Sequence, residues 1–339
     1  MKLIVTGGAG FIGSNFVHRI LAAHADWTVL VVDKLTYAGN LKNLESELAS
    51  GRCEFVQMDI CDPGVGEVLR GCDAVVHFAA ESHVDRSIED ATAFVRTNIE
   101  GTFNLIQASR AAAVPRFIHV STDEVYGSLG EDGEFTEESP LQPNSPYAAS
   151  KAASDLLVLA YVRTHNFPAI VTRCSNNYGP YQFPEKFIPL MIAQASEGKR
   201  LPVYGKGTNV RDWLHVNDHC DAVEVVLLKG RCGEVYNIGG GCEMRNLDVA
   251  RLILKKFELS DDQVEFVKDR PGHDLRYAIN CDKLSRETGW HARIAFEHGL
   301  RETIDWYRDN RVWLDDVRSG TYREYFERHY LHRDRTFAG

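Results

Sequence analysis

Three glycines at a fixed spacing near the N-terminus constrain the fold of this chain more than any other feature. Gly7, Gly10 and Gly13 follow the apolar run 3–6 and precede an amphipathic stretch from residue 14 to about 25. The first glycine allows a tight turn, the second lets the backbone approach a pyrophosphate, and the third lets the helix pack closely on the strand. The free N–H groups and positive dipole end of that helix then face the phosphates. The pattern therefore predicts a dinucleotide-binding strand–turn–helix unit, although a glycine turn without a ligand has the same spacing.

Short apolar runs alternate with helical patterns through the first half of the chain. The predicted strands are residues 3–6, 29–33, 54–57, 74–78, 116–121 and 169–173, and longer helices are predicted over about 93–113 and 146–164. Strands that are apolar on both faces and separated by helices indicate a parallel sheet covered on both sides. Right-handed crossovers then give an α/β fold with a doubly wound parallel sheet, the Rossmann arrangement.

The character of the chain changes after residue 176, where prolines and glycines punctuate short segments. At 339 residues the chain also exceeds the size of most single cores, about 250–300 residues. We expect a Rossmann domain over residues 1–175, to which the chain returns around 208–240, and a smaller, mainly substrate-binding lobe built on loops over 176–330. Within the second half a strand is predicted at 235–239 and helices at about 247–257 and 296–308. Residues 331–339 are expected to fray.

Charge and composition exclude several classes of protein. Lys and Arg number 38 against 48 Asp and Glu, so the net charge of −10 would repel nucleic acid, and a phosphate ligand would need local donors. No apolar run approaches the roughly 18–20 residues of a membrane span, and no secretory signal is recognisable. The eight cysteines are scattered without Cys-x-x-Cys spacing, which favours reduced thiols over disulfides or a zinc site. We expect a cytoplasmic protein without metal, nucleic-acid or membrane partners.

A carboxylate at the end of the second predicted strand indicates which dinucleotide binds. Asp33 lies twenty residues after Gly13, where a carboxylate accepts a hydrogen bond from the ribose 2′-hydroxyl and repels a 2′-phosphate. This favours NAD over NADP, although Lys34 weakens the preference. Further expected cofactor contacts are Phe11 and Ile12 in the glycine turn, Lys34 beside Asp33, Asp59 and Ile60 after the third strand, and Phe78, Ala79 and Ala80 after the fourth. For the residues after the third and fourth strands, ordinary strand-end packing is an equal alternative.

A tyrosine and a lysine share one face of the helix predicted at 146–164. Ser145 can cap this helix and Pro146 suits its first position. Tyr147 and Lys151 are four residues apart. A phenol ionises near pH ~10, but a neighbouring ammonium and a positive nicotinamide both favour the phenolate. The pair therefore predicts a proton shuttle for oxidising an alcohol, the alternative being a solvated surface pair.

Two adjacent carboxylates follow the predicted strand 116–121. Thr122, Asp123 and Glu124 lie where ligands bind in open α/β sheets, at the carboxyl ends of the strands. A solvated turn with a capping Asp is the alternative. Removing a hydroxyl β to a ketone needs a base for the α-proton and an acid for the leaving oxygen. Mutual repulsion in a closed site would separate the two pKa values, leaving one carboxylate ionised and the other protonated.

Together these motifs closely resemble the nucleotide-sugar 4,6-dehydratases of the extended short-chain dehydrogenase/reductase family. The resemblance extends from residue 6 to about residue 307. Besides the glycine turn and Tyr147 with Lys151, it rests on residues 79–87, 122–127, 173–180, 183–186, 201–205, 209–213 and 270–274. The Asp123–Glu124 pair is its discriminating part, because related 4-epimerases and decarboxylases generally lack the pair.

The resemblance implies a three-step cycle on tightly held NAD. Tyr147 takes the proton of the sugar 4-hydroxyl while C4 gives up a hydride; Thr122 hydrogen-bonds that hydroxyl, and Lys151 tunes the tyrosine and holds the nicotinamide ribose. Glu124 then removes the C5 proton, and Asp123 protonates the C6 hydroxyl as it leaves. The hydride returns to C6, giving a 4-keto-6-deoxy sugar nucleotide.

The resemblance also implies the substrate and its contacts. The substrate is dTDP-glucose, with UDP-glucose as an open alternative because one methyl group is worth only ~1–3 kcal/mol of discrimination. The implied substrate contacts, besides Thr122, are Ser82, Asn176, Lys186, Arg211, Asn246, Arg270, His273 and Tyr307, with Pro202 and Tyr204 at the nucleobase and Asn177 at the nicotinamide amide. An anionic diphosphate suits two bidentate arginines and a lysine point charge.

Other functions remain open at this point: a 4-epimerase or uronate decarboxylase, or an NAD-binding regulatory protein. Asp123 and Glu124 argue against the first class, and the retention of Tyr147 with Lys151 argues against the second. The resemblance further implies a homodimer in which helices near 94–113 and 147–164 form a four-helix interface. The apolar residues Leu156, Leu157 and Leu159 agree with this, but suit an intramolecular core equally well.

Overall fold

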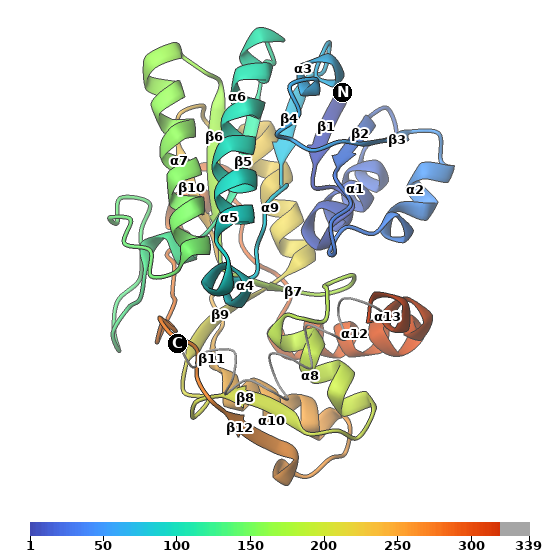
Figure 1. Cartoon of the computed structure of the whole chain (residues 1–339), viewed down its shortest axis with the longest axis vertical. Helices are drawn as coiled ribbons and strands as arrows, with labels where there is room; N and C mark the ends of the chain where they lie inside the picture. Colours follow the sequence, from blue (N-terminus) through green and yellow to red (C-terminus); the bar gives the residue numbers. More distant parts are fainter. Residues whose placement is uncertain (319–339) are drawn as a thin grey trace.

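A seven-stranded parallel sheet forms the centre of the molecule in the computed structural model, which describes residues 1–318 (Figure 1). The strand order is β10-β6-β5-β4-β1-β2-β3. The strands are β1 (Lys2–Thr6), β2 (Thr28–Asp33), β3 (Cys53–Gln57), β4 (Ala74–His77), β5 (Phe117–Thr122), β6 (Ala169–Cys174) and β10 (Val235–Ile238). Each lies within one residue of its predicted range. The doubly wound parallel sheet is therefore confirmed.

Helices cover both faces of this sheet, which explains why its strands are apolar throughout. Leu3 and Val5 point to one face and pack with α1 (Phe11–Ala23) and α9 (Val216–Lys229). Ile4 points to the other face, where α3 (Val65–Val68), α6 (Thr102–Ala111) and α7 (Pro146–His165) pack. Figure 1 shows α6 and α7 on the side of the sheet opposite to α1 and α9. Alternating side chains thus enter two different cores.

The single helix predicted over 93–113 is divided in the structure. After α4 (Val84–Glu89), the chain forms α5 (Thr92–Phe94), the π-helical segment η2 (Val95–Gly101) and then α6. Gly101, at the end of the π-helical segment, packs so closely that a Cβ atom there would lie 2.7 Å from Ile60 Cδ1. Sequence periodicity cannot distinguish such a wide turn from a regular helix.

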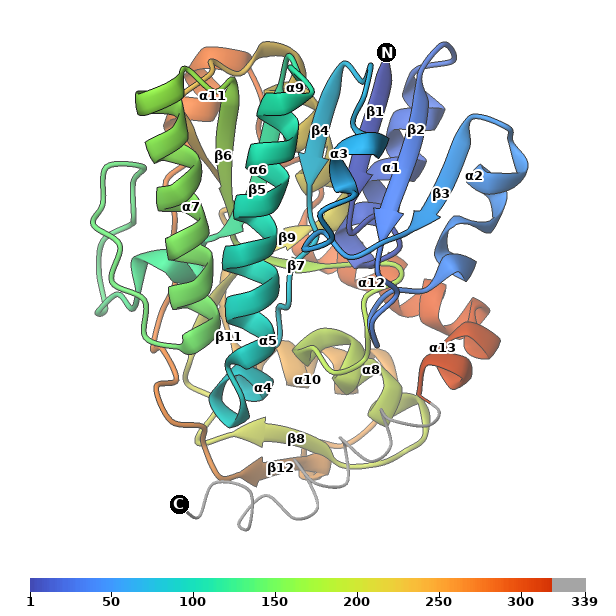
Figure 2. The same ribbon diagram turned by 45° about the horizontal axis from the view of Figure 1, so that its top comes forward.

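A second layer of helices and two small sheets lies at the carboxyl ends of the strands (Figure 2). Its helices are α8 (Phe187–Ser196), α10 (Asn246–Lys256), α12 (Phe296–Asp309) and α13 (Arg311–Val317). One sheet pairs β8 (Leu201–Tyr204) with β12 (Val264–Val267), and the other has the order β11 (Glu243–Arg245), β9 (Val210–His215), β7 (Asn176–Tyr178). The remaining short elements are η1 (Leu41–Leu44), α2 (Glu45–Ala49), η3 (Asp123–Tyr126), η4 (Asp261–Gln263) and α11 (Asp282–Thr288).

The expectation of a lobe built on loops is wrong for this region. Helix α8 is not predictable from periodicity because it is apolar nearly all round, so it has no 3.6-residue pattern, and Pro189 lies in its first turn, where proline is tolerated. Helix α9 is also absent from the predicted elements, although it carries apolar residues at helical spacing, at 216, 220, 223 and 227. The helices predicted near 247–257 and 296–308 are present as α10 and α12.

The predicted boundary after residue 175 stays a prediction, and the predictions for residues 319–339 lie outside the described part of the chain. Of the helices within residues 1–318, none has the length and apolar character needed to cross a membrane.

Candidate active site

Two adjoining cavities lie between the carboxyl ends of the sheet strands and the second layer. The first cavity is bordered by the ends of β1, β2, β4 and β5 and by the first turn of α7. The second cavity lies among β8, β9 and the start of α8. Glu124, Asn176, Glu185 and Lys186 line both cavities, so these residues mark the junction.

The glycine turn forms one wall of the first cavity. Gly7 has a φ of +70°, and a Cβ atom there would lie 2.6 Å from the backbone nitrogen of Ala79. At Gly13 a Cβ atom would lie 2.3 Å from the Gly7 carbonyl oxygen. Gly10 precedes α1 and supplies no side-chain cap, so the N–H groups of Phe11 and Ile12 border the cavity without one. This arrangement suits a pyrophosphate.

Asp33 lies at the end of β2 and lines the same cavity. Its two carboxylate oxygens accept backbone hydrogen bonds from Ala9 (3.0 Å) and Leu35 (2.8 Å), while burial raises its pKa. Lys34 forms a 2.7 Å ion pair with Asp59. The positive charge that weakened the preference for NAD is thus compensated by a neighbouring carboxylate. This strengthens the electrostatic argument against a 2′-phosphate.

The lining of the first cavity carries buried polar atoms that have no hydrogen-bond partner in the described part of the chain. This lining includes Ile60, Phe78, Ala79 and Ala80. Within residues 1–318, several buried oxygens on this lining have no hydrogen-bond partner, among them Ser121 Oγ, Asn177 Oδ1 and Gln182 Oε1. Buried polar atoms normally find partners. A ligand with amide and hydroxyl groups, such as nicotinamide riboside, would supply them.

Tyr147 and Lys151 face the first cavity from the first turns of α7. Ser145 Oγ accepts from the Ala148 N–H at 3.1 Å, and Pro146 occupies the first helical position, so the predicted cap is confirmed. Lys151 is only 4% exposed, and its Nζ donates to the Val120 carbonyl at 2.9 Å. Burial lowers the pKa of Lys151 to about 8.

Burial works against ionisation of Tyr147, whereas the predicted effects of the ammonium and the nicotinamide favour it. Burial raises the pKa of Tyr147 well above its usual range, the negative charge of Glu124 adds to this, and a hydrogen bond with Thr122 opposes it. The Lys151 ammonium, which donates to the Val120 carbonyl, does not offset this burial by itself. In the protein alone the phenol therefore stays protonated.

The carboxylate pair sits on η3, the short turn that directly follows β5. Thr122 precedes this turn, and its Oγ1 accepts from the Glu124 N–H at 3.3 Å. Asp123 is 1% exposed; burial raises its pKa well above normal, and the charges of Glu124 and Asp212 raise it further.

The charges around Glu124 differ from those around Asp123. Burial raises its pKa as well, but the positive charges of Arg270, Lys186 and Arg211 oppose the shift. Asp123 therefore holds its proton more readily than Glu124 does, which agrees with an acid at Asp123 and a base at Glu124.

The second cavity gathers most of the residues expected to hold substrate. Asn176, Lys186, Pro202, Tyr204, Arg211, Asn246, Arg270 and His273 all line it. Arg211 donates to the Asp274 carbonyl (2.9 Å) and stacks on Tyr277, with 4.4 Å between the guanidinium carbon and the ring centroid. Three cationic side chains thus converge on one small cavity in an acidic protein, as an anionic diphosphate requires.

Three expected substrate residues lie elsewhere, one of them Thr122, which lines the first cavity. Ser82 lines the first cavity rather than the second, and its carbonyl accepts from Lys186 Nζ. Tyr307 lies in the apolar core of the second layer, 2% exposed, and donates to the Gln182 carbonyl. Among residues 1–318 that line the two cavities, Tyr307 is not present.

Several cavity residues were not foreseen, above all Asp85, Glu185 and Tyr277, with His83 beside them. Asp85 receives hydrogen bonds from Arg270 (3.2 Å) and Tyr204 (2.6 Å), and Glu185 receives one from Tyr37 (2.8 Å). Asp85 and Glu185 fall inside the segments 79–87 and 183–186 that carried the family resemblance, so a signal existed. Their partners become visible only in the fold.

Comparison with known proteins identifies close relatives. The family model described as GDP-mannose 4,6 dehydratase matches residues 4–303. A dTDP-glucose 4,6-dehydratase of Streptomyces niveus is 54% identical over 324 residues, covering 94% of this chain and 96% of the relative. The crystal structure of DesIV, a dTDP-glucose 4,6-dehydratase from Streptomyces venezuelae with NAD and dTDP bound, has a TM-score of 0.92 and 52% identity and covers 94% of this chain and 100% of its own.

The fold itself is shared more widely. A UDP-glucose 4-epimerase from Thermus thermophilus in complex with NAD has a TM-score of 0.85 and 30% identity, covering 91% of this chain and 100% of its own. Fold alone therefore does not separate elimination from epimerisation, and the side chains of the site must do so.

Proposed function

The chain belongs to the GDP-mannose 4,6-dehydratase family, and from this premise we propose that it converts dTDP-glucose into dTDP-4-keto-6-deoxyglucose and water. The relatives that match almost its whole length carry this activity in their names. The observation that carries the proposal is the carboxylate pair Asp123–Glu124, at the same strand end that faces Tyr147 and Lys151.

The enzyme uses NAD, for which the first cavity is suited. The residues that would hold it are the glycine turn with Phe11 and Ile12 at the pyrophosphate, Asp33 at the adenosine ribose, Asp59 and Ile60 at the adenine, Phe78, Ala79 and Ala80 along the cofactor, and Lys151 and Asn177 at the nicotinamide end. Bound NAD supplies the reversible uptake of a hydride, from C4 of the sugar and back to C6, so the reaction has no net redox change.

Tyr147 and Thr122 act on the sugar 4-hydroxyl. Tyr147 removes its proton once the positive nicotinamide and the Lys151 ammonium offset the burial of the phenol, since both favour the phenolate. Thr122 hydrogen-bonds the same hydroxyl and fixes its orientation. Because the Lys151 ammonium alone does not offset the burial of the phenol, Tyr147 can lose its proton only when oxidised NAD is bound.

The two carboxylates then divide the elimination between them. A C4 ketone acidifies the C5–H bond, and Glu124, the carboxylate surrounded by cations, removes that proton. Asp123, whose burial keeps it protonated, gives its proton to the C6 oxygen, which leaves as water. Glu124 can return a proton to C5 when C6 is reduced.

The second cavity accounts for recognition of the nucleotide. Arg211 and Arg270 suit the diphosphate as bidentate donors and Lys186 as a point charge, while Pro202 and Tyr204 suit the base and Asn176, Asn246 and His273 the sugar and its linkage. A single methyl contact is worth only about 1–3 kcal/mol, so the base pocket alone does not decide between thymine and uracil. The assignment of thymine therefore rests on the relatives.

We also propose that the chain forms a homodimer. Val95, Phe103 and Leu156 are 45%, 42% and 57% exposed and lie on η2, α6 and α7. η2 continues directly into α6, and α6 and α7 run side by side in Figures 1 and 2. A second copy that presents the same helices would cover these side chains in a four-helix interface. A cytoplasmic location agrees with the eight free cysteines, since a reducing compartment keeps thiols unpaired.

The experiment that tests the function compares dTDP-glucose with UDP-glucose, each incubated with the purified protein and analysed by mass spectrometry. We expect dTDP-glucose to lose one water at the higher rate. Equal rates would move the substrate assignment, and an unchanged mass with both sugars after NAD is added would overturn the proposed reaction.

A further inference from the structure

Beyond the residues that line the cavities, we propose that Arg173 is a positioning residue that sets the carboxylate pair against the Tyr147–Lys151 helix. This inference rests on the proposed function, because it concerns how two catalytic steps act on one sugar. We call the contacts of Arg173 with its neighbours Asp155 and Tyr126 the link. Without the link, oxidation at C4 would still proceed, while the rate of elimination across C5 and C6 would fall.

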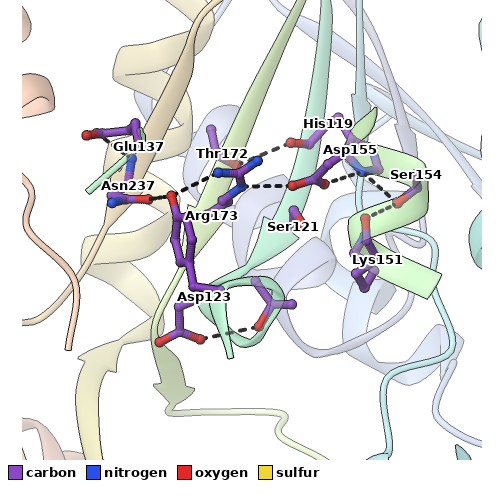
Figure 3. Close-up of polar contacts among 12 residues, drawn as sticks. His119, Ser121, Asp123, Glu137, Lys151, Ser154, Asp155, Thr172, Arg173 and Asn237 are labelled. Carbon is purple, nitrogen blue, oxygen red and sulfur yellow. Dashed lines mark hydrogen bonds and ion pairs between the residues drawn. The ribbon is translucent and has the colours of Figure 1, made fainter. Parts of the chain in front are cut away.

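Arg173 is buried in the interior of the protein, where it bonds to two other side chains. It lies on β6, is 3% exposed, and its Nε donates to Asp155 Oδ2 at 2.8 Å. Its Nη1 donates to the Tyr126 hydroxyl at 2.9 Å, and the guanidinium carbon lies 4.8 Å from the Tyr126 ring centroid. Figure 3 shows Arg173 in line with Asp155 and His119 on one side and Asn237 on the other.

Each end of this link reaches an element that carries catalytic side chains. Asp155 lies on α7 one turn after Lys151. Tyr126 is the last residue of η3, the turn that begins with Asp123. One guanidinium therefore spans the helix of the proton shuttle and the turn of the carboxylate pair.

The Asp155 end is a buried charge pair with a fixed geometry. Burial acts to raise the pKa of Asp155, but the hydrogen bond with His119 and the charge of Arg173 hold it below its usual value. His119 Nε2 lies 3.3 Å from Asp155 Oδ1, and burial lowers the pKa of His119 to about 4, so the ring is neutral. Separating such a buried pair would leave an uncompensated charge, so Arg173 and Asp155 each hold the other in place.

The Tyr126 end fixes the turn to the sheet. Its hydroxyl accepts from Arg173 and donates to Asn237 Oδ1 at 2.7 Å, and burial raises its pKa to about 12, so the phenol remains a donor. Asn237 belongs to β10, and its N–H donates to Glu137 at 3.0 Å. The turn is thereby held at a definite distance from β6 and β10.

None of these link residues is a cavity residue: among residues 1–318 that line the two cavities, Arg173, Asp155 and Tyr126 are not present. They can act on the sugar only through the elements they hold. The requirement is strict, because Tyr147 must reach the C4 hydroxyl while Glu124 and Asp123 reach C5 and C6 of the same ring. Displacements of about 1 Å in such arrangements cost roughly 100-fold in rate.

The test separates oxidation from elimination by rapid quenching and mass spectrometry. With dTDP-glucose as substrate, the 4-keto sugar nucleotide is lighter by two hydrogens and the product is lighter by one water. In Tyr126→Phe and Arg173→Lys we expect the first species to form within about twofold of the unaltered rate and the second to form at least roughly tenfold more slowly, so the 4-keto species accumulates.

Thr172→Val is the matched control, since Thr172 is the fully buried neighbour of Arg173 on β6 and bonds only to the His119 carbonyl among the contacts described. It should leave the ratio of the two rates unchanged. The double variant Tyr126→Phe/Arg173→Lys should lose no more than the worse single variant, because both remove the same link.

Equal slowing of both steps, or additive losses in the double variant, would overturn the positioning role. If Arg173→Lys fails to fold, Tyr126→Phe still decides, since it removes a single oxygen. Failure of the unaltered enzyme to release water would instead contradict the proposed function, so the two failures are distinguishable.

Discussion

Burial of Lys151 sets the pH range in which its ammonium can assist Tyr147. Its ammonium is 4% exposed, and burial lowers its pKa to about 8. The protonated form is the one that favours the Tyr147 phenolate, and it is lost as the pH rises through this value.

We therefore expect kcat/KM to fall as the pH rises through about 8. In Lys151→Arg the guanidinium stays charged at any accessible pH, so the alkaline fall at this pH should disappear even if the rate is lower. Steady-state pH profiles of the two proteins measure this, and an identical alkaline limb in the variant would rule out Lys151 as its source.

Removing Glu124 and removing Asp123 should block different steps of the elimination. Glu124→Gln lacks the base for C5–H, so neither solvent exchange at C5 nor water loss should occur. Asp123→Asn keeps the base but lacks the acid, so C5 should still exchange with D₂O while water loss falls by roughly 100- to 10,000-fold. Exchange followed by NMR distinguishes them, and the reverse pattern would exchange the two assigned roles.

Much of the candidate site could be predicted at this scale, because it depends on local spacing. The glycine turn, the Tyr147–Lys151 pair and the Asp123–Glu124 pair all line the first cavity. Asp85 could not be assigned a partner, since Arg270 and Tyr204 are 185 and 119 residues away. Tyr307 is expected at the substrate only from the family resemblance, and no clear motif surrounds it. Its ring packs in the apolar core of the second layer.

At the scale of elements, the contact between β1 and α1 depends on the third glycine. A Cβ atom at Gly13 would lie 2.3 Å from the Gly7 carbonyl oxygen, which belongs to backbone and cannot swing away. Gly13→Ala should therefore push α1 from the turn, lower the free energy of unfolding by about 1–3 kcal/mol and reduce the NAD bound.

The NAD content of the purified protein and its affinity for added NAD, by calorimetry, measure this effect. Gly130→Ala is the control, because Gly130 has open space around it and no positive φ. Full NAD binding by Gly13→Ala would show that the helix can move without loss of the site.

The short apolar runs of the sheet and three capped or amphipathic helices were predictable, while two other helical segments were not. The sheet strands and α7, α10 and α12 were located to within a residue or so. Helix α8 has apolar residues on nearly all sides and therefore lacks the 3.6-residue pattern. The π-helical turn of η2 cannot be distinguished from a regular helix in the sequence.

At the scale of the whole molecule, the exposed side chains on η2, α6 and α7 predict a dimer. Leu156→Asp would bury a charge in the proposed four-helix interface, where an unpaired ion is costly, and should yield a monomer. Val312→Asp, at a 77% exposed position on α13, is the matched control and should leave the assembly unchanged. Analytical ultracentrifugation at working concentration decides, and a Leu156→Asp protein that sediments like the unaltered protein would place the interface elsewhere.

The central claim is that a single site oxidises C4, eliminates water and reduces C6 of one sugar. The most direct measurement follows dTDP-glucose labelled with deuterium at C4 through the reaction by NMR and mass spectrometry. We predict a product that has lost one water and carries the deuterium at C6. Deuterium that remains at C4 in an epimerised sugar, or that is lost to solvent, would contradict the account.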